Sequence, residues 1–301
     1  MSRTKPGTSA RLNPVVFFSS ASVVLLLSAL MVRYPATSER WLERAQALSI
    51  TTFGWYYMLV IVACLGFVVW LAFARVGQVR LGQEDERPQF SYLAWISMLF
   101  SSGIGIALLY YGVYEPLDHF LAPPEGNGGT AQAAREALVL TFLHWGLHGW
   151  ALYALVGVAL GYFAYRKNLP LALRSALYPV FGERIHGAIG HWVDAFGILA
   201  TLISMVTNLG IGALVVQSGL ADLLGWPSTP STLLAIIGVM MVTATLATAS
   251  GVEHGIAWLS KINVRLLGLL VLFVLVCGPT RHLLDGLVQN TGDYLAAFVK
   301  K

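Results

Sequence analysis

Three aromatic side chains lie within nine residues of one another in an uncharged part of this sequence. Segment 142–153 reads FLHWGLHGWALY and contains Trp145, Trp150 and Tyr153. On one continuous helix, Trp145 and Trp150 would lie about 140° apart with Tyr153 between them, so the three rings would share one side. Several aromatic faces together can hold a quaternary ammonium group, which offers no N–H for hydrogen bonding. The spacing therefore predicts part of a cation cage; ordinary aromatic packing is the alternative.

The same segment holds His144 and His148, the i,i+4 spacing of two zinc ligands on a helix. A zinc-dependent membrane hydrolase also needs a general base, but no Glu follows the first histidine. No cysteine or carboxylate is placed by the sequence to complete the ligand set, and Glu115 and Asp194 look like residues at the ends of hydrophobic stretches. We therefore predict no catalytic residue and no metal site, with a zinc enzyme as the minor alternative.

A glycine-rich stretch, SSGIGIA at 101–107, lies in the middle of another uncharged segment. Glycine lowers helix propensity by about 1 kcal/mol relative to alanine. An interrupted helix at the centre of a membrane can present backbone carbonyls to an ion or a substrate. A small-residue face for close helix packing is the equally weighted alternative.

The elements that must position these residues are hydrophobic helices. Of the 301 residues, 56% are hydrophobic and 11% are charged, against about 25% charged in soluble domains. About 20 apolar residues in a helix cross the hydrocarbon core of a bilayer. We therefore expect an all-α integral membrane protein with seven transmembrane helices, near 14–32, 51–74, 92–114, 137–165, 193–221, 231–250 and 256–278.

The positive charges set the expected orientation. The net charge of +4 does not indicate nucleic-acid binding, because most Lys and Arg fall in the segments 1–13, 75–87, 166–191 and 261–265, all on one side of the predicted topology. Positive residues collect on the side that is not translocated, so we expect a cytoplasmic N-terminus. Cys64 and Cys277 both lie within spans, which implies no disulfide framework.

The predicted spans divide the chain into four regions. They are a cytoplasmic tail (1–13), two leading transmembrane helices (14–91), five further spans (92–280) and an amphipathic segment (281–301). In the last region, apolar residues recur at helical spacing around 290–293, which predicts one or two short helices on the outer interface. An amphipathic cytoplasmic connection is expected at 166–191.

Seven collinear blocks together resemble the betaine/carnitine/choline transporter family over nearly the whole chain. They are FSSGIG at 100–105 with YGVYEP at 111–116, HWG at 144–146 with Trp150 and Tyr153, YFAYR at 162–166 with Leu169 and Pro170, RSALYP at 174–179, LGIG at 209–212, SG at 250–251 with WLSKIN at 258–263, and GPT at 278–280.

The resemblance implies a secondary transporter, not an enzyme, in the bacterial inner membrane. Its substrates would be trimethylammonium solutes such as glycine betaine, choline or carnitine, and its fold two leading helices plus one five-helix repeat of a LeuT-like inverted-repeat architecture. It implies substrate contacts from Trp145, Trp150, Tyr153, Gly103, Gly105 and Ala107. It implies ion contacts from Ser102, Gly103, Ile104, Gly105 and Thr201, with Na⁺ or H⁺ as the coupling ion and no other cofactor.

The chain stops where that family continues into a second repeat. We therefore expect the N-terminal portion of a transporter, truncated and lacking the second repeat. The alternative is a nontransporting membrane fragment or subunit that needs a partner. The expected partners are the solute, the lipid bilayer, and either a homo-oligomer or a complementary second-half chain, but no nucleic acid.

Overall fold

The computed structural model describes residues 13–298, with the side chains of all of them except 102–108, 253 and 254. This part of the chain consists of helices and connections, without a β-strand. Among the described residues, six helical segments are long and apolar enough to cross a membrane, with the stretch Ala131–Arg166 counted as one of them, and Tyr92–Ser101 is a shorter apolar helical segment. The protein is an all-helical, multi-pass integral membrane protein.

The described residues form two compact units, 13–86 with 151–204 and 87–150 with 205–298. The first unit contains α1 (Pro14–Arg33), α2 (Pro35–Phe73), η1 (Arg75–Gln78), most of α6 (Leu147–Gly161), η3 (Tyr162–Arg166), η4 (Leu173–Leu177), α7 (Tyr178–Phe181), η5 (Gly182–His186) and the start of α8 (Ala188–Leu224). The second contains α3 (Tyr92–Ile106), η2 (Ala107–Tyr111), α4 (Gly112–Leu121), α5 (Ala131–Trp145), the rest of α8, α9 (Pro230–Ala249), η6 (Val252–Ile256), α10 (Ala257–Cys277) and α11 (Thr280–Ala297).

Helix α2 is much longer than the predicted span at 51–74. It begins at Pro35 and contains 39 residues, which makes it about 58 Å long at 1.5 Å per residue. Hydropathy marks only the part that matches the hydrocarbon core, whereas the preceding residues, among them Glu39, Arg40, Glu43 and Arg44, are charged and exposed. The helix therefore continues beyond the membrane-crossing segment.

The connection at 166–191 folds into short helical turns within the first unit. Asp194 Oδ1 accepts a hydrogen bond from the backbone N–H of Arg174 at 3.1 Å. Its Oδ2 lies 3.1 Å from Nε of the same arginine. The Ser175 hydroxyl donates to the Pro170 carbonyl, and Ile185 is fully buried. Asp194, which looks like a boundary residue in the sequence, thus fastens the connection to the start of α8.

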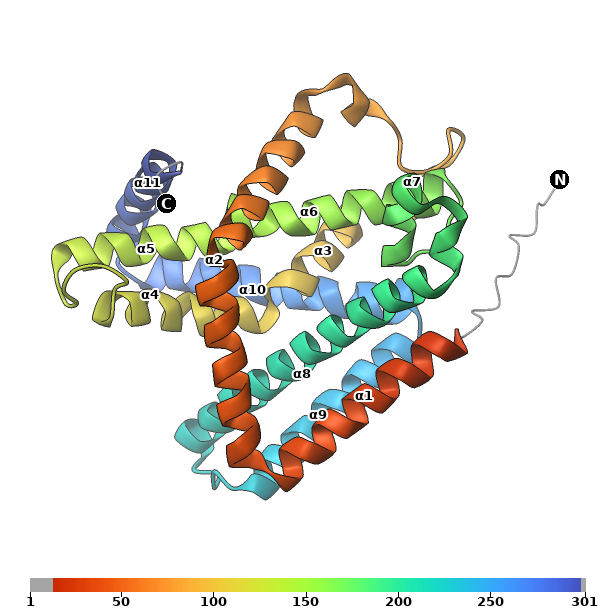
Figure 1. Cartoon of the computed structure of the whole chain (residues 1–301). Helices are drawn as coiled ribbons and strands as arrows, with labels where there is room; N and C mark the ends of the chain where they lie inside the picture. Colours follow the sequence, from red (N-terminus) through yellow and green to blue (C-terminus); the bar gives the residue numbers. More distant parts are fainter. Residues whose placement is uncertain (1–12, 299–301) are drawn as a thin grey trace. The chain divides into compact units, whose positions relative to one another are not determined.

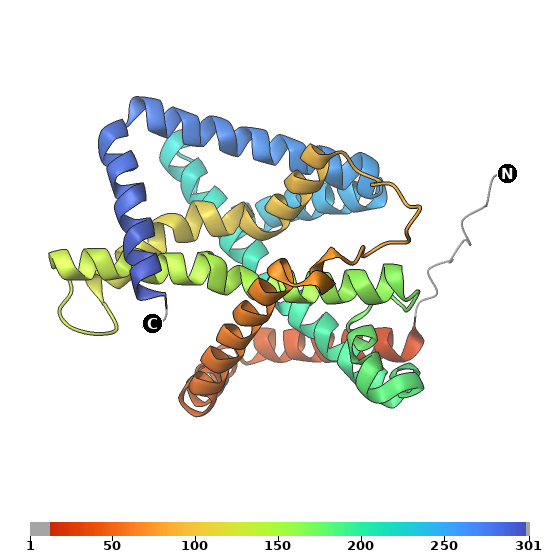
Figure 2. The ribbon, with the colours of Figure 1, turned by 90° about the horizontal axis from the view of Figure 1, so that it is seen from above.

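In the second unit, α4 and α5 lie side by side, joined by loop 122–130, and α11 packs on α5 (Figures 1 and 2). Helix α3 packs on α10, where the Ser101 hydroxyl donates to the Ser260 carbonyl at 3.2 Å. The predicted third span, 92–114, is not one regular helix: it passes from α3 through the π-helical turn η2 into α4.

The C-terminal segment also differs from the prediction. We expected one or two short helices around a break at 290–293, but α11 runs through these residues from Thr280 to Ala297. Contacts with two other helices stabilise this region, because Asp293 accepts from Arg135 on α5 and the Tyr294 hydroxyl is hydrogen-bonded to His148 on α6. Tertiary packing thus overrides the weak helix preference of the Asn-Thr-Gly sequence.

Candidate functional site

A break at Gly146 separates α5 from α6. Gly146 has φ −95° and ψ −147°, and its N–H donates to the Phe142 carbonyl at 2.8 Å. A Cβ atom at this position would lie 2.3 Å from the Phe142 carbonyl oxygen. The helix predicted across 137–165 is therefore not continuous at this residue, although Ala131–Arg166 is apolar and long enough to cross a membrane as one span. The angle of about 140° between Trp145 and Trp150 rests on that continuity and does not hold.

Trp145, the last residue of α5, is held by two neighbours. Its indole Nε1–H donates to Glu115 Oε2 at 2.6 Å. Its ring centroid lies 5.7 Å from that of Tyr111, with the ring planes tilted by 33°. A hydrogen bond at the ring edge and an aromatic contact together restrict how an indole can rotate. Trp145 as a whole residue remains 38% exposed.

The other two predicted cage residues lie on α6. Trp150 is half-buried, and Tyr153 is 70% exposed. Three residues apart on a helix, their side chains lie on neighbouring faces, about 60° apart. The structure thus places Trp145 on α5 against Glu115 and Tyr111, and Trp150 and Tyr153 on the next helix. The cage itself stays a prediction.

The predicted glycine-rich and ion-binding residues fall mostly in a segment whose side chains lie outside the described residues: Ser102, Gly103, Ile104, Gly105 and Ala107. The backbone remains helical to Ile106 and then widens into the π-helical turn Ala107–Tyr111. Turns of this kind occur frequently at functional sites. The irregularity thus follows the glycines directly.

Thr201, the remaining predicted ion ligand, lies on α8 in the first unit. Its hydroxyl donates to the Gly197 carbonyl one turn earlier, at 2.8 Å. It also lines a mainly apolar cavity of about 740 Å³ together with Asn13, Ser20 and Asp194. The ion site stays a prediction.

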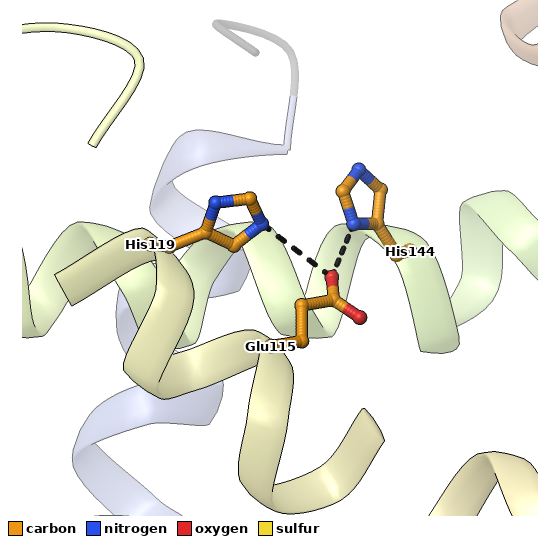
Figure 3. A group of neighbouring side chains, drawn as sticks. All are labelled: Glu115, His119 and His144. Carbon is orange, nitrogen blue, oxygen red and sulfur yellow. Dashed lines mark hydrogen bonds and ion pairs between the residues drawn. The ribbon is translucent and has the colours of Figure 1, made fainter. Parts of the chain in front are cut away.

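Three side chains that the sequence analysis did not bring together form a cluster, Glu115, His119 and His144, which we call the Glu115 cluster (Figure 3). Glu115 lies on α4, is 9% exposed, and faces α5. Its Oε1 contacts His144 Nδ1 and lies 3.6 Å from His119 Nε2, while Oε2 accepts the Trp145 N–H. Glu115 is therefore not a boundary residue.

A sequence signal for this cluster existed. Glu115 and His119 have i,i+4 spacing and thus share a helix face. The sequence alone could not identify the partner helix. His144 lies 29 positions after Glu115, and only the packing of α4 on α5 brings the two side chains together.

His148 has a different environment from His144. Its Nδ1 lies 2.9 Å from the Tyr294 hydroxyl, and its ring centroid lies 4.5 Å from that of Phe298. Burial of the Tyr294 phenol raises its pKa above the ordinary value. The break at Gly146 thus sends the two histidines to different partners, and the zinc pair considered from their i,i+4 spacing is wrong.

An ion pair fastens α11 beside this site. Arg135 on α5 donates from Nε to Asp293 Oδ2 at 3.0 Å and from Nη2 to Oδ1 at 2.7 Å. This two-point hydrogen bond to the arginine holds the pKa of Asp293 below its ordinary value. Side-chain contacts therefore connect α5 to α4 through Glu115 and α5 to α11 through Arg135.

Comparison with known proteins identifies the family of this chain. Residues 15–301 match the model of the betaine/carnitine/choline family transporters. An osmo-independent choline transporter of Acinetobacter baylyi is 63% identical over 97% of this chain and 56% of its own length. A high-affinity choline transport protein of Escherichia coli is 46% identical over 96% of the chain and 43% of its own length.

A glycine betaine transporter of Bacillus subtilis is more distant, 39% identical over 92% of this chain and 55% of its own length. The chain thus spans about half the length of the curated relatives that it matches. Since the family match covers nearly every residue, this chain belongs to the betaine/carnitine/choline family of transporters.

Proposed function

We propose that the chain is the N-terminal part of a secondary transporter for quaternary ammonium solutes, with choline or glycine betaine as the substrate. The observation that carries this proposal is the family match over 15–301, with relatives named as choline and glycine betaine transporters at 39–63% identity. In this reading the chain supplies one part of a solute pathway, in a bacterial plasma membrane.

The restricted orientation of the Trp145 indole ring supports this function. A methylated ammonium is attracted to the negative face of an aromatic ring, and a desolvated contact of this kind contributes about 2 kcal/mol. A ring that is already restricted by Glu115 and Tyr111 loses little conformational freedom when the cation binds. We propose that Trp145, Trp150 and Tyr153 supply ring faces, and that the backbone near Gly103, Gly105 and Ala107 approaches the solute.

The test is a Trp150→Ala variant. We expect the dissociation constant for choline to rise roughly 5- to 30-fold, which corresponds to about 1 to 2 kcal/mol, because one cation–π contact is removed. Binding of radiolabelled choline to the purified chain measures this. Trp55→Ala on α2, whose ring is 70% exposed, is the matched control and should leave the constant unchanged. An unchanged constant in Trp150→Ala would count against the cage.

A second candidate function rests on the coverage of about half of each relative. The chain would then be a nontransporting membrane component that needs a second copy or a complementary second-half chain. Uptake measurements in cells that express only this chain distinguish the two candidate functions. Saturable uptake of labelled choline supports independent transport, whereas background uptake that rises only when a second-half chain is co-expressed supports the partner requirement.

We also propose that an ion gradient, of Na⁺ or H⁺, drives the uptake, with Thr201 and the 102–105 backbone as ion ligands. Replacing Na⁺ by K⁺ at constant pH, and adding a protonophore at constant Na⁺, distinguishes the two ions. Uptake insensitive to both treatments would contradict coupling. Finally, the distribution of Lys and Arg supports a cytoplasmic N-terminus.

A further inference from the structure

We propose that the Glu115 cluster is a binding site for one divalent transition-metal ion of the zinc class. Its members offer two imidazole nitrogens and one carboxyl oxygen, and these three atoms all lie within 4.8 Å of one another. Two histidines and one carboxylate are a ligand set that suits Zn²⁺ and its neighbours in the first transition row, and not Mg²⁺ or Ca²⁺, which prefer oxygen ligands alone.

The carboxyl group of Glu115 is already oriented for this role. The Trp145 N–H occupies Oε2, which leaves Oε1 facing the two imidazole rings. Metal-ligating carboxylates are commonly fixed by such a hydrogen bond to the oxygen that does not bind the metal. The Trp145 indole would thus not touch the metal itself but would orient the Glu115 carboxyl group that does.

His119 supplies the second argument. Its Nε2 is buried and has no hydrogen-bond partner among the residues that the structure describes, although it points towards Oε1 at 3.6 Å (Figure 3). A buried polar atom without a partner is costly. A metal ion between the two histidines and Glu115 would satisfy this nitrogen, since a neutral imidazole nitrogen is an electron-pair donor.

Access and geometry also fit. The side chain of His144 is 52% exposed, whereas those of His119 and Glu115 are 19% and 11% exposed. An ion can therefore approach from the side of His144 and reach two shielded ligands behind it. Three protein ligands leave a fourth tetrahedral position for water. The bound ion would join α4 to α5, beside the indole proposed to contact the solute.

The experiment measures zinc binding to the full chain purified in detergent, with no solute present. Equilibrium dialysis followed by elemental analysis should give one Zn²⁺ per chain. We expect His119→Ala and His144→Ala each to weaken the affinity at least tenfold, and Trp145→Phe, which keeps an aromatic ring but removes the N–H that donates to Glu115, to weaken it about tenfold. His148→Ala is the matched control, since its imidazole bonds Tyr294 instead, and it should bind zinc like the wild type.

The proposal is overturned if the wild-type chain takes up no zinc at 100-fold molar excess, or if the His119 and His144 variants bind as the wild type does. It is also overturned if His148→Ala loses affinity equally. Should an alanine variant not fold, Co²⁺ bound to the wild-type chain provides a second measurement: strong visible absorption reports a four-coordinate ion, as expected for three protein ligands and one water, whereas the weak absorption of an octahedral ion contradicts the site. Because choline is absent from each of these measurements, the result does not depend on whether the proposed transport function holds.

Discussion

Glu115 shows how one side chain organises the site. A glutamate whose side chain is 11% exposed next to apolar helices needs partners, and Glu115 has the Trp145 indole, His144 and, at longer range, His119. The sequence indicated the functional importance of Trp145 but assigned Glu115 to a span boundary. The reason is physical: a glutamate before a proline at the end of a hydrophobic block looks the same whether it faces water or a neighbouring helix.

A Glu115→Ala variant should therefore lower the free energy of unfolding by about 1 to 3 kcal/mol, because the Trp145 N–H loses its acceptor in a partly buried environment. Glu115→Gln keeps a carbonyl oxygen for that N–H and should cost less. Thermal unfolding in detergent measures the difference, with Glu125→Ala in the exposed loop 122–130 as the control. Equal losses in the Ala and Gln variants would show that Glu115 does not act through this hydrogen bond.

Among the helices, those that fill the hydrocarbon core were the easiest to predict. The expected spans 14–32, 231–250 and 256–278 agree within one or two residues with α1, α9 and α10. Long uncharged blocks leave the backbone no alternative to the helix. The break at Gly146 was not predicted, because a single glycine inside a hydrophobic block is compatible with a continuous helix.

A Gly146→Ala variant tests this break. Its Cβ would lie 2.3 Å from the Phe142 carbonyl oxygen and 3.3 Å from the Tyr294 hydroxyl, so the backbone must shift. We expect a loss of about 1 to 3 kcal/mol in the free energy of unfolding, as for other overpacked sites. A Cβ at Gly157 on α6 would meet no atom of another described segment within 4 Å, so Gly157→Ala should be neutral or slightly stabilising. Similar melting temperatures for the two variants would contradict the described break.

The contact between α5 and α11 should depend on pH. Because the folded state lowers the pKa of Asp293, the ion pair with Arg135 stabilises the fold above the ordinary carboxyl pKa of about 3.9. This stabilisation is lost as the pH falls below that value through the folded pKa. The melting temperature should therefore fall more steeply between pH 6 and pH 3 in the wild type than in the Asp293→Asn variant. Asp285→Asn, at a 72% exposed position on the same helix, should retain the steep decline.

At the scale of the whole molecule, composition and the length of the uncharged segments predicted the all-helical membrane class, whereas they did not predict the division into two compact units. Helices α6 and α8 each contribute to both units. Hydrophobic blocks predict how many segments can cross a membrane, but they carry no information on which helices pack together. The contacts of α4 with α5 and of α3 with α10 therefore had to come from the structure.

The proposed orientation makes a prediction about the termini. With a cytoplasmic N-terminus and an odd number of spans, alkaline phosphatase fused after Lys301 should be active, because it would lie outside the plasma membrane. A green fluorescent protein fused before Met1 should fluoresce, and the same reporter after Lys301 should not. The reverse pattern of reporter activity would show that the topology is the opposite of the proposed one.

The length of α2 has a mechanical consequence. If residues 51–73 fill the hydrocarbon core, the end at Pro35 stands roughly 24 Å beyond it. A stiff rod converts a small tilt about the bilayer centre into a large sweep at its far end. A tilt of 20° would displace Pro35 by about 14 Å, more than twice the displacement at the membrane surface. A spin label near Ala36 would thus report small tilts of the membrane-crossing part of α2 as large displacements, at a position outside the residues proposed to contact the solute.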